Sequence, residues 1–316
     1  MARILPIKDD ALEEATRLLR EGHLVAFPTE TVYGLGANAL DAKAVAKIYA
    51  AKKRPQFNPL IVHVPNVEDV RAFVVMNARA EKIAAALWPG PLSLVLPRTP
   101  DCGLSHLVSA GLHTAAMRVP SSAPARQLLR AAGVPVAAPS ANKSGMLSPT
   151  EAKHVSDAFG DNVALILDAG PCTVGLESTV LDLSTEVPTL LRAGGILLET
   201  LESVLKESIA VAGYDDTAPK SPGMLSRHYA PNTPLRINAP HAVDGEALLG
   251  FGAPVSDEWA NLSPAGDLVE AAANLFRMLH ELDAQNHTGI AVCPIPEEGL
   301  GRAINDRLRR AAKGEK

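Results

Sequence analysis

Short apolar runs that alternate with helical segments constrain the fold of this chain most strongly. In the first two thirds of the chain, apolar runs of strand length recur at residues 23–27, 60–64, 92–96, 115–119, 134–138, 163–168 and 178–183. Between them, apolar residues spaced by three or four predict helices at residues 11–20, 41–51, 123–132 and 150–159. Such alternation is typical of a layered α/β fold. Because prolines and glycines interrupt several runs, we expect antiparallel as well as parallel strand pairs, and therefore a twisted mixed sheet with helices.

A change of amino-acid composition and periodicity near residue 209 divides the chain into three parts. Residues 210–234, AVAGYDDTAPKSPGMLSRHYAPNTP, combine glycine, proline and polar residues and follow neither the helix nor the strand period. Beyond them, strand-like runs at residues 235–238, 247–251 and 289–293 accompany apolar helical faces at residues 268–279 and from Arg302 onward. We therefore predict a first domain over residues 1–208, a linker over residues 209–234, and a smaller, Rossmann-like α/β domain over residues 235–316.

Composition and charge limit the classes of function. The 316 residues carry a formal net charge of −5, so the chain has no overall positive field and we expect no stable binding of nucleic acid. Three cysteines without paired spacing indicate a reduced compartment, and no metal ligand is predicted. MARILPIKDD contains no apolar leader, and no stretch approaches the roughly 18 apolar residues of a membrane span. We expect a cytoplasmic protein without membrane contact.

Four stretches place polar residues near predicted strand ends, where ligands of α/β sheets tend to bind. They are PTETVYGLG (residues 28–36), AKKRPQFNPLIVHV (51–64), APSANKSG with SPT (138–150), and GLESTVLDL with LRAG (175–194). Gly34 and Gly36 begin a dinucleotide-binding fingerprint, but Ala39 stands at the position of its third glycine. The pair can equally form a tight turn.

Each candidate residue in these stretches also has a purely structural interpretation. Lys52, Lys53 and Arg54 could be a solvated helix end near the C-terminal dipole or a phosphate site. His63 could be an ordinary sheet residue that alternates away from its apolar neighbours. Ser140 and Asn142 could be turn residues. Arg118 differs, because a guanidinium inside a buried strand needs an anion, supplied by a protein carboxylate or by a ligand.

The order of these blocks closely resembles the threonylcarbamoyl-AMP synthase family with its YrdC-type fold. PTETVYGLG, KxR with NPLIVH, the R-x-P strand end, PSAN, ESTV and LRAG follow one another over about residues 10–200. SPGMLSRHYAP, NLSPAGDL and GLGRAINDRL resemble the linker and extra C-terminal domain of the long form of that family.

The resemblance implies an L-threonylcarbamoyladenylate synthase. Such an enzyme converts L-threonine, bicarbonate and ATP to threonylcarbamoyl-AMP and pyrophosphate, with Mg²⁺ accompanying ATP. Downstream enzymes use the product to form threonylcarbamoyladenosine in tRNA. Carried onto this sequence, the threonine site comprises Thr31, His63, Arg118, Ala138 and Ser178. Ala138 stands where a small hydroxyl residue is frequent, so it offers only backbone contact.

The nucleotide site carried over in the same way is larger. It comprises Lys52, Arg54, Asn58, Thr114, Ser140, Asn142, Ser148, Arg192 and Tyr229, of which Lys52 and Arg54 are predicted to be catalytic. No general base is evident, so we expect catalysis by alignment and charge neutralisation. We expect Thr31 to face the ligand, Gly34 and Gly36 to let the backbone approach it, and the linker to cover the cleft as a lid with Tyr229 on the nucleotide.

Two alternatives remain open at this point. An RNA-binding or ribosome-assembly module could use the basic residues 52–54 on a concave sheet surface, although the acidic total charge disfavours it. An enzyme of the same fold could instead handle carbamoyl-phosphate, but such proteins usually carry zinc-type cysteine pairs, which this sequence lacks.

Overall fold

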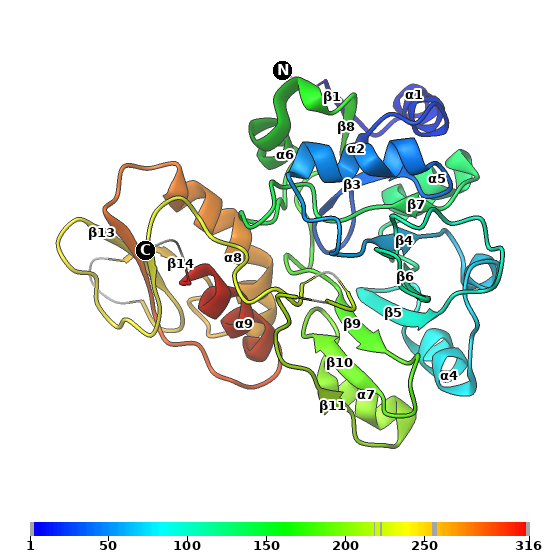
Figure 1. Ribbon diagram of the computed structural model, residues 1–316. Coiled ribbons are helices and arrows are strands. Elements are labelled where there is room, and N and C mark those ends of the chain that lie inside the picture. Colours follow the sequence, from blue (N-terminus) through cyan, green and yellow to red (C-terminus); the bar gives the residue numbers. More distant parts are fainter. Residues whose placement is uncertain (1–2, 218, 222, 255–257, 314–316) are drawn as a thin grey trace.

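The computed structural model describes residues 3–217, 219–221, 223–254 and 258–313, and it contains a large domain and a smaller C-terminal domain joined by a linker (Figure 1). The large domain has strands β1 (Ile4–Pro6), β2 (Val25–Pro28), β3 (Tyr33–Asn38), β4 (Ile61–His63), β5 (Leu92–Pro97), β6 (Thr114–Arg118), β7 (Val136–Ala137), β8 (Leu165–Asp168), β9 (Thr179–Asp182), β10 (Thr189–Arg192) and β11 (Ala210–Val211). Its α-helices are α1 (Asp9–Arg20), α2 (Ala42–Lys52), α3 (Val67–Val70), α4 (Ala78–Leu87), α5 (Ala123–Ala132), α6 (Ala152–Phe159) and α7 (Leu198–Leu205).

One mixed sheet organises the large domain. Within the described ranges its strand order is β1-β8-β2-β3-β7-β4-β6-β5-β9-β10-β11. The β4–β6 and β5–β9 pairs are parallel, whereas β2–β3, β5–β6 and β9–β10 are antiparallel. The predicted mixed α/β sheet is confirmed.

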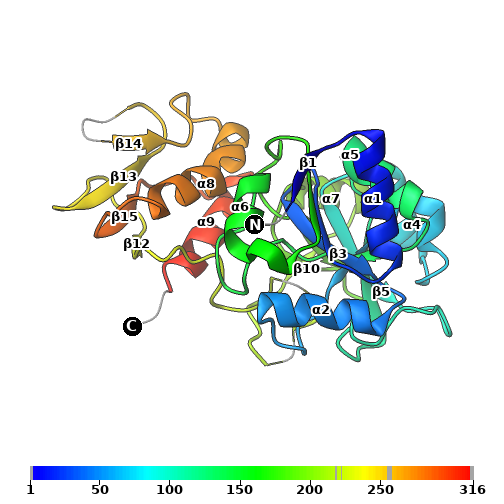
Figure 2. The same ribbon diagram turned by 90° about the horizontal axis from the view of Figure 1, so that it is seen from above.

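The two faces of this sheet are covered differently. One face packs against α2, α4, α6 and α7 in a large apolar core. On the opposite face, α1 and α5 cover β2 and β7. Farther along that second face, Ile61, Val95, Ala116 and Val180 meet Met224 of the linker. Figure 2 shows α1 and α5 together at the edge of the large domain remote from the C-terminal domain. The linker therefore replaces a helix as the cover of half a sheet face.

The C-terminal domain is a small parallel α/β unit, as predicted. It contains β12 (Leu235–Arg236), β13 (Glu246–Gly250), β14 (Glu258–Asn261) and β15 (Gly289–Val292), with helices α8 (Leu268–Asp283) and α9 (Gly301–Ala311). In the described part of the chain these strands pair in the order β12-β15-β13-β14, all parallel. None of the helices within the described ranges is long and apolar enough to cross a membrane.

The core of the C-terminal domain continues into the rest of the molecule. Its apolar cluster includes Val32, Leu147 and Leu176 of the large domain and Tyr229 of the linker. His154 of α6 and His280 of α8 stack across the boundary, with ring centroids 3.9 Å apart. The two domains are therefore docked through an apolar interface.

The sequence pattern did not indicate helices α4 and α7 or strand β3. Strand β3 was missed because glycine disfavours strands. Gly34 and Gly36 lie inside β3, so the tight-turn interpretation is wrong. A Cβ at Gly36 would lie 2.9 Å from the Phe27 ring and 3.1 Å from the Val25 carbonyl oxygen. At Gly34 it would lie 3.2 Å from the Ala138 Cβ. Neighbouring protein atoms fill the space at both glycines. The expectation that Gly36 lets the backbone approach a ligand is therefore wrong. For Gly34 this expectation is incomplete, because Gly34 contacts Ala138 and also borders a cavity.

The first residues of the predicted linker also differ from expectation. Ala210–Val211 forms β11 and pairs in parallel with β10, so it extends the large sheet. The later linker is held by the Ala230 amide, which donates to the Gly145 carbonyl at 2.8 Å.

Replacement of Gly36 by alanine should destabilise the large domain by about 1–3 kcal/mol, because the added methyl overpacks the site between Phe27, Val136 and the β2 backbone. Gly213→Ala is the matched control, since no atom lies within 4 Å of its added methyl group. The control should change the free energy of unfolding by less than about 0.5 kcal/mol. Chemical denaturation of both variants measures the difference, and equal stabilities would contradict this packing role of Gly36.

Candidate active site

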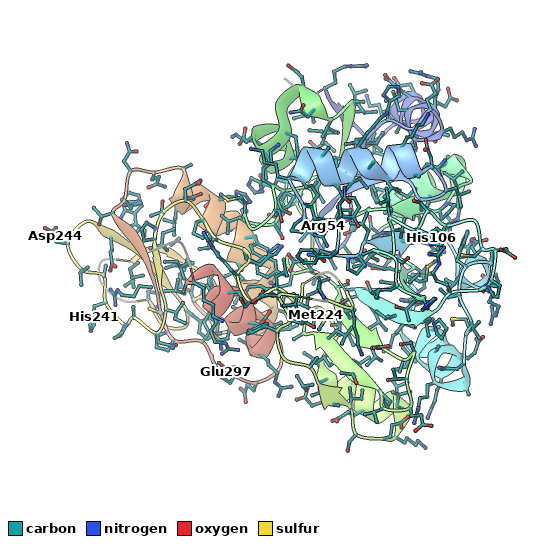
Figure 3. The ribbon with its side chains drawn as sticks, viewed as in Figure 1. Arg54, His106, Met224, His241, Asp244 and Glu297 are labelled. Atoms are coloured by element: carbon teal, nitrogen blue, oxygen red, sulfur yellow. The ribbon has the colours of Figure 1, made fainter. Side chains whose placement is uncertain are left out.

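A cavity lies between the linker and the sheet face that carries β4 and β6. Strand residues Ile61, His63 and Arg118 form part of its wall, and Gly223, His228 and Tyr229 of the linker form another part. Figure 3 shows Arg54 and Met224 in the middle of the molecule, whereas the labelled His241, Asp244 and Glu297 lie in the C-terminal domain.

Many of the predicted site residues meet at this cavity. Those on its wall are Thr31, Arg54, His63, Arg118, Ala138, Ser140, Ser178, Arg192 and Tyr229. Residues that are far apart in the sequence are thus brought together.

The remaining predicted residues lie outside the wall. Three of them contact the wall from behind: Lys52 contacts Ser140, Asn58 contacts Arg54, and Ser148 contacts Glu177. Asn142 contacts Lys52 in turn. Thr114 lies at the opposite end of β6 from Arg118, and its role in the site stays a prediction.

Arg118 finds its anion in the protein. Its Nη2 donates to the Glu30 carboxylate at 2.7 Å and to the Thr31 hydroxyl at 2.9 Å. Burial alone would raise the pKa of Glu30, but Arg118 lowers it below the ordinary value, so the pair is ionised. Arg118 Nε has no hydrogen-bond partner among the described residues and is buried. This guanidinium can therefore still donate to a ligand.

His63 is the neutral polar group of the same wall. It lies on the cavity face of β4, two residues after Ile61, as strand alternation requires. Burial and the nearby Arg118 charge lower its pKa to about 3. Its Nδ1 finds no partner in the described residues, which leaves one imidazole nitrogen for a ligand.

Lys52 and Arg54 are buried, whereas Lys53 between them is exposed. The solvated helix end is therefore the wrong interpretation for Lys52 and Arg54, and these two cannot form an exposed RNA-binding surface. Lys52 Nζ donates to the carbonyl oxygens of Ser140 and Asn142. Burial and the charges of Arg54 and Lys143 hold its pKa well below the ordinary value. A bound anion would stabilise the charged form of Lys52 and raise its pKa again.

Two further guanidinium groups, of Arg54 and Arg192, line the cavity. Arg54 donates to the side chain and carbonyl of Asn58, and burial together with Arg192 lowers its pKa to about 10. Arg192 donates to the carbonyl and hydroxyl oxygens of Ser178. Both partners are neutral, so these contacts orient the cations without neutralising them.

Three residues of the linker, Gly223, His228 and Tyr229, line the cavity. Gly223 packs so tightly on Arg192 that an added Cβ would lie 2.5 Å from the Arg192 Cδ. His228 is buried, and burial and the charges of Arg310 and Arg54 hold its pKa well below the ordinary value. Tyr229 is buried in a left-handed backbone conformation with φ of 65°. Such a conformation is costly for tyrosine and is frequent at functional sites.

Four polar residues of the site were not predicted as such from the sequence: Thr29, Glu30, Glu177 and His228. Thr29 orders the turn between β2 and β3, because its hydroxyl contacts the Thr31 hydroxyl at 2.7 Å and donates to the Val32 carbonyl. Glu177 is the carboxylate of the described cavity wall and accepts from the Ser148 hydroxyl. The signal for Glu30 was available, because a buried arginine requires a carboxylate or a ligand.

The charge balance of the wall indicates an anionic ligand. Among the described wall residues, Arg54, Arg118 and Arg192 face one carboxylate, Glu177. Lys52 adds a further buried cation behind them. This excess is local, because the whole chain is acidic. The arrangement can hold a carboxylate near Arg118 and several phosphate groups near Arg54 and Arg192.

The chain is similar to known proteins over nearly its whole length. A family model described as "Telomere recombination" matches residues 17–194, and one described as "Threonylcarbamoyl-AMP synthase, C-terminal domain" matches residues 196–313. The threonylcarbamoyl-AMP synthase of Bacillus subtilis is 41% identical and covers 98% of this chain and 95% of its own length. That of Pyrococcus abyssi is 40% identical, with 97% and 95% covered. The crystal structure of P. abyssi Sua5 complexed with L-threonine superposes with a TM-score of 0.90 at 38% identity, over 99% of this chain and 97% of that one.

Proposed function

The chain belongs to the threonylcarbamoyl-AMP synthase family, and we infer that it makes threonylcarbamoyl-AMP from L-threonine and ATP for the modification of tRNA. The observation that carries this function is one cavity with two chemically different halves. One half presents Arg118 and neutral His63, and the other presents Arg54 and Arg192 with Lys52 behind them. Threonine and ATP need these two kinds of site.

The threonine half is formed by Thr31, His63, Arg118, Ala138 and Ser178. The threonine carboxylate binds Arg118, whose Nε has no partner among the described residues. The Glu30 carboxylate holds the guanidinium in place. Neutral His63 can accept a hydrogen bond from the threonine hydroxyl or amine, since burial keeps its imidazole uncharged at neutral pH. Ala138 contributes backbone groups alone.

The nucleotide half holds the triphosphate between Lys52, Arg54 and Arg192. Ser140, Asn142 and Ser148 lie on the loop that follows β7 and supply directional polar groups. The Ser140 and Asn142 carbonyls accept from the Lys52 ammonium. Asn58 orients Arg54. Negative charge that develops as pyrophosphate leaves meets cations that are already in position, so no reorganisation is needed at the reacting phosphate.

Bicarbonate is the proposed third substrate. The threonine amine and bicarbonate form a carbamate with loss of water, and a carbamate oxygen attacks the α-phosphorus of ATP. The bond from the α-phosphorus to the bridging oxygen breaks, and pyrophosphate leaves. Alignment of the two halves therefore performs most of the catalysis, without a dedicated general base.

Mg²⁺ is proposed to accompany ATP. Glu177 is the carboxylate of the described wall, and Ser148 and Arg307 already occupy its two oxygens. Phosphate oxygens and water suit Mg²⁺ as ligands, so the ion is held chiefly by the substrate, where it offsets phosphate charge.

The linker is proposed to act as a lid between a catalytic domain at residues 1–208 and a C-terminal domain at residues 235–316. Met224 covers the sheet face, and Gly223, His228 and Tyr229 close the cavity. A closed lid excludes water from an adenylate that would otherwise hydrolyse. The product then passes to a second enzyme that transfers the threonylcarbamoyl group to tRNA.

The purified chain should release pyrophosphate from ATP only when threonine and bicarbonate are both present. Mass spectrometry of the nucleotides should detect threonylcarbamoyl-AMP in the complete mixture with Mg²⁺. Equal pyrophosphate release without threonine or without bicarbonate would contradict the proposed reaction and indicate a simple ATPase.

Replacement of Arg118 by alanine should weaken threonine binding by about 2–5 kcal/mol, because the substrate carboxylate loses its charged partner. The substitution is best made with Glu30→Gln, so that no unpaired carboxylate stays buried. Arg130→Ala, at an exposed position of α5, is the matched control and should bind threonine normally. Calorimetric titration with threonine and with ATP provides the comparison. Unchanged threonine affinity in the double variant would make Arg118 a purely structural ion-pair residue.

A further inference from the structure

Two arginines of the C-terminal domain are buried deeply beside the cavity. Arg307 and Arg310 of α9 have exposed fractions of 1% and 0%. The Arg310 guanidinium lies 4.7 Å and that of Arg307 5.1 Å from the centre of the Tyr229 ring. Arg310 Nε also donates to the Leu225 carbonyl at 2.9 Å. Helix α9 therefore contacts the linker through two buried cations.

Arg307 reaches past the linker to the cavity wall itself. Its Nε donates to Glu177 Oε2 at 2.9 Å, and its Nη1 donates to Asp306 at 2.7 Å. The other oxygen of Glu177 accepts from the Ser148 hydroxyl. A chain of contacts thus runs from the C-terminal domain through Glu177 to the loop of the proposed nucleotide site.

The charge of Glu177 gives this contact its importance. Burial would raise the pKa of Glu177, but Arg307 and Arg192 lower it below the ordinary value, so the carboxylate is ionised at neutral pH. It lines the same cavity as Arg54 and Arg192, which are proposed to hold the triphosphate. An uncompensated carboxylate there would repel phosphate and compete with it for both cations.

We propose that Arg307 is a positioning residue of the reaction, supplied by the C-terminal domain. It cancels the charge of Glu177 and fixes that carboxylate against Ser148, which leaves Arg54 and Arg192 to the triphosphate. This inference rests on the proposed function in one respect, because it takes the anion of this half to be ATP. It gives the C-terminal domain a chemical task in addition to its apolar docking.

The test compares ATP and threonine affinities of four variants of the full chain, using a fluorescent ATP analogue and calorimetry. Arg307→Gln should weaken ATP binding about 10- to 100-fold, and it should change threonine affinity less than about 3-fold. Arg307→Gln with Glu177→Gln removes both charges and should restore ATP affinity to within about 3-fold of the original chain. Arg307→Lys keeps the positive charge and should lose less ATP affinity than Arg307→Gln. Arg309→Gln, whose side chain on the same helix pairs with exposed Glu297, is the matched control.

A variant that loosens docking separates this role from a structural one. A Cβ at Gly175 would lie 2.4 Å from the Ala272 carbonyl oxygen and 2.5 Å from the Ala273 Cα of α8, so Gly175→Ala disturbs the interface without removing a charge. Gly175→Ala should not reproduce the selective loss of ATP affinity. The proposal is overturned when Gly175→Ala weakens ATP binding as selectively as Arg307→Gln does, or when Arg307→Gln weakens ATP and threonine binding equally. It is also overturned when adding Glu177→Gln to Arg307→Gln does not restore ATP affinity.

When Arg307→Gln does not fold, the double variant alone decides the test, because it removes both charges of the Arg307–Glu177 pair and leaves neither buried without the other. ATP affinity near that of the original chain supports the proposal, and a loss of 10-fold or more contradicts it. These readouts measure binding. Failure to form threonylcarbamoyl-AMP in the complete mixture would refute the proposed function separately, without affecting the comparison of ATP affinities.

Discussion

Burial of cations around one small cavity is the constraint on which the rest of the structure depends. Lys52, Arg54, Arg118 and Arg192 each have an exposed fraction of 8% or less. Removing such charges from water is costly unless protein dipoles or opposite charges replace the solvent. Backbone carbonyls hold Lys52, Arg54 and Arg192, and Glu30 holds Arg118. Since carbonyls orient cations without neutralising them, the folded chain is prepared for an anionic ligand.

The second consequence of this constraint is the cover over the cavity. A sheet face that carries so many polar groups cannot pack against an apolar helix, and α1 and α5 cover only its other half. The linker takes that place through Met224 and Tyr229, and the C-terminal domain supports it through Arg307 and Arg310. Linker and C-terminal domain are thus integral to the site, although both lie outside the large sheet.

The sequence predicted the parts of the fold and site that depend on local pattern. Most strands, most of the longer helices, Asp41 as an N-cap and the alternation of His63 away from its apolar neighbours follow from local pattern and were predicted from it. Helices α4 and α7 were not predicted. Strand β3 was missed because its glycines are typical of a turn. The reason for these glycines is the Phe27 ring on the neighbouring strand, which leaves no room for a Cβ at Gly36. Glu30 and Glu177 were missed as partners because Arg118 and Arg307 lie 88 and 130 residues away in the sequence. Helix and strand periodicity describes only neighbouring residues, so it cannot predict pairs that are so far apart in the sequence. For the same reason it cannot predict that α9 contacts the linker and Glu177.

A crystal structure of the full chain with L-threonine and a non-hydrolysable ATP analogue tests the central claim most directly. The account predicts the threonine carboxylate on Arg118, the triphosphate against Lys52, Arg54 and Arg192, and Tyr229 closed over both. A triphosphate bound outside this cavity, or a threonine carboxylate away from Arg118, would contradict it.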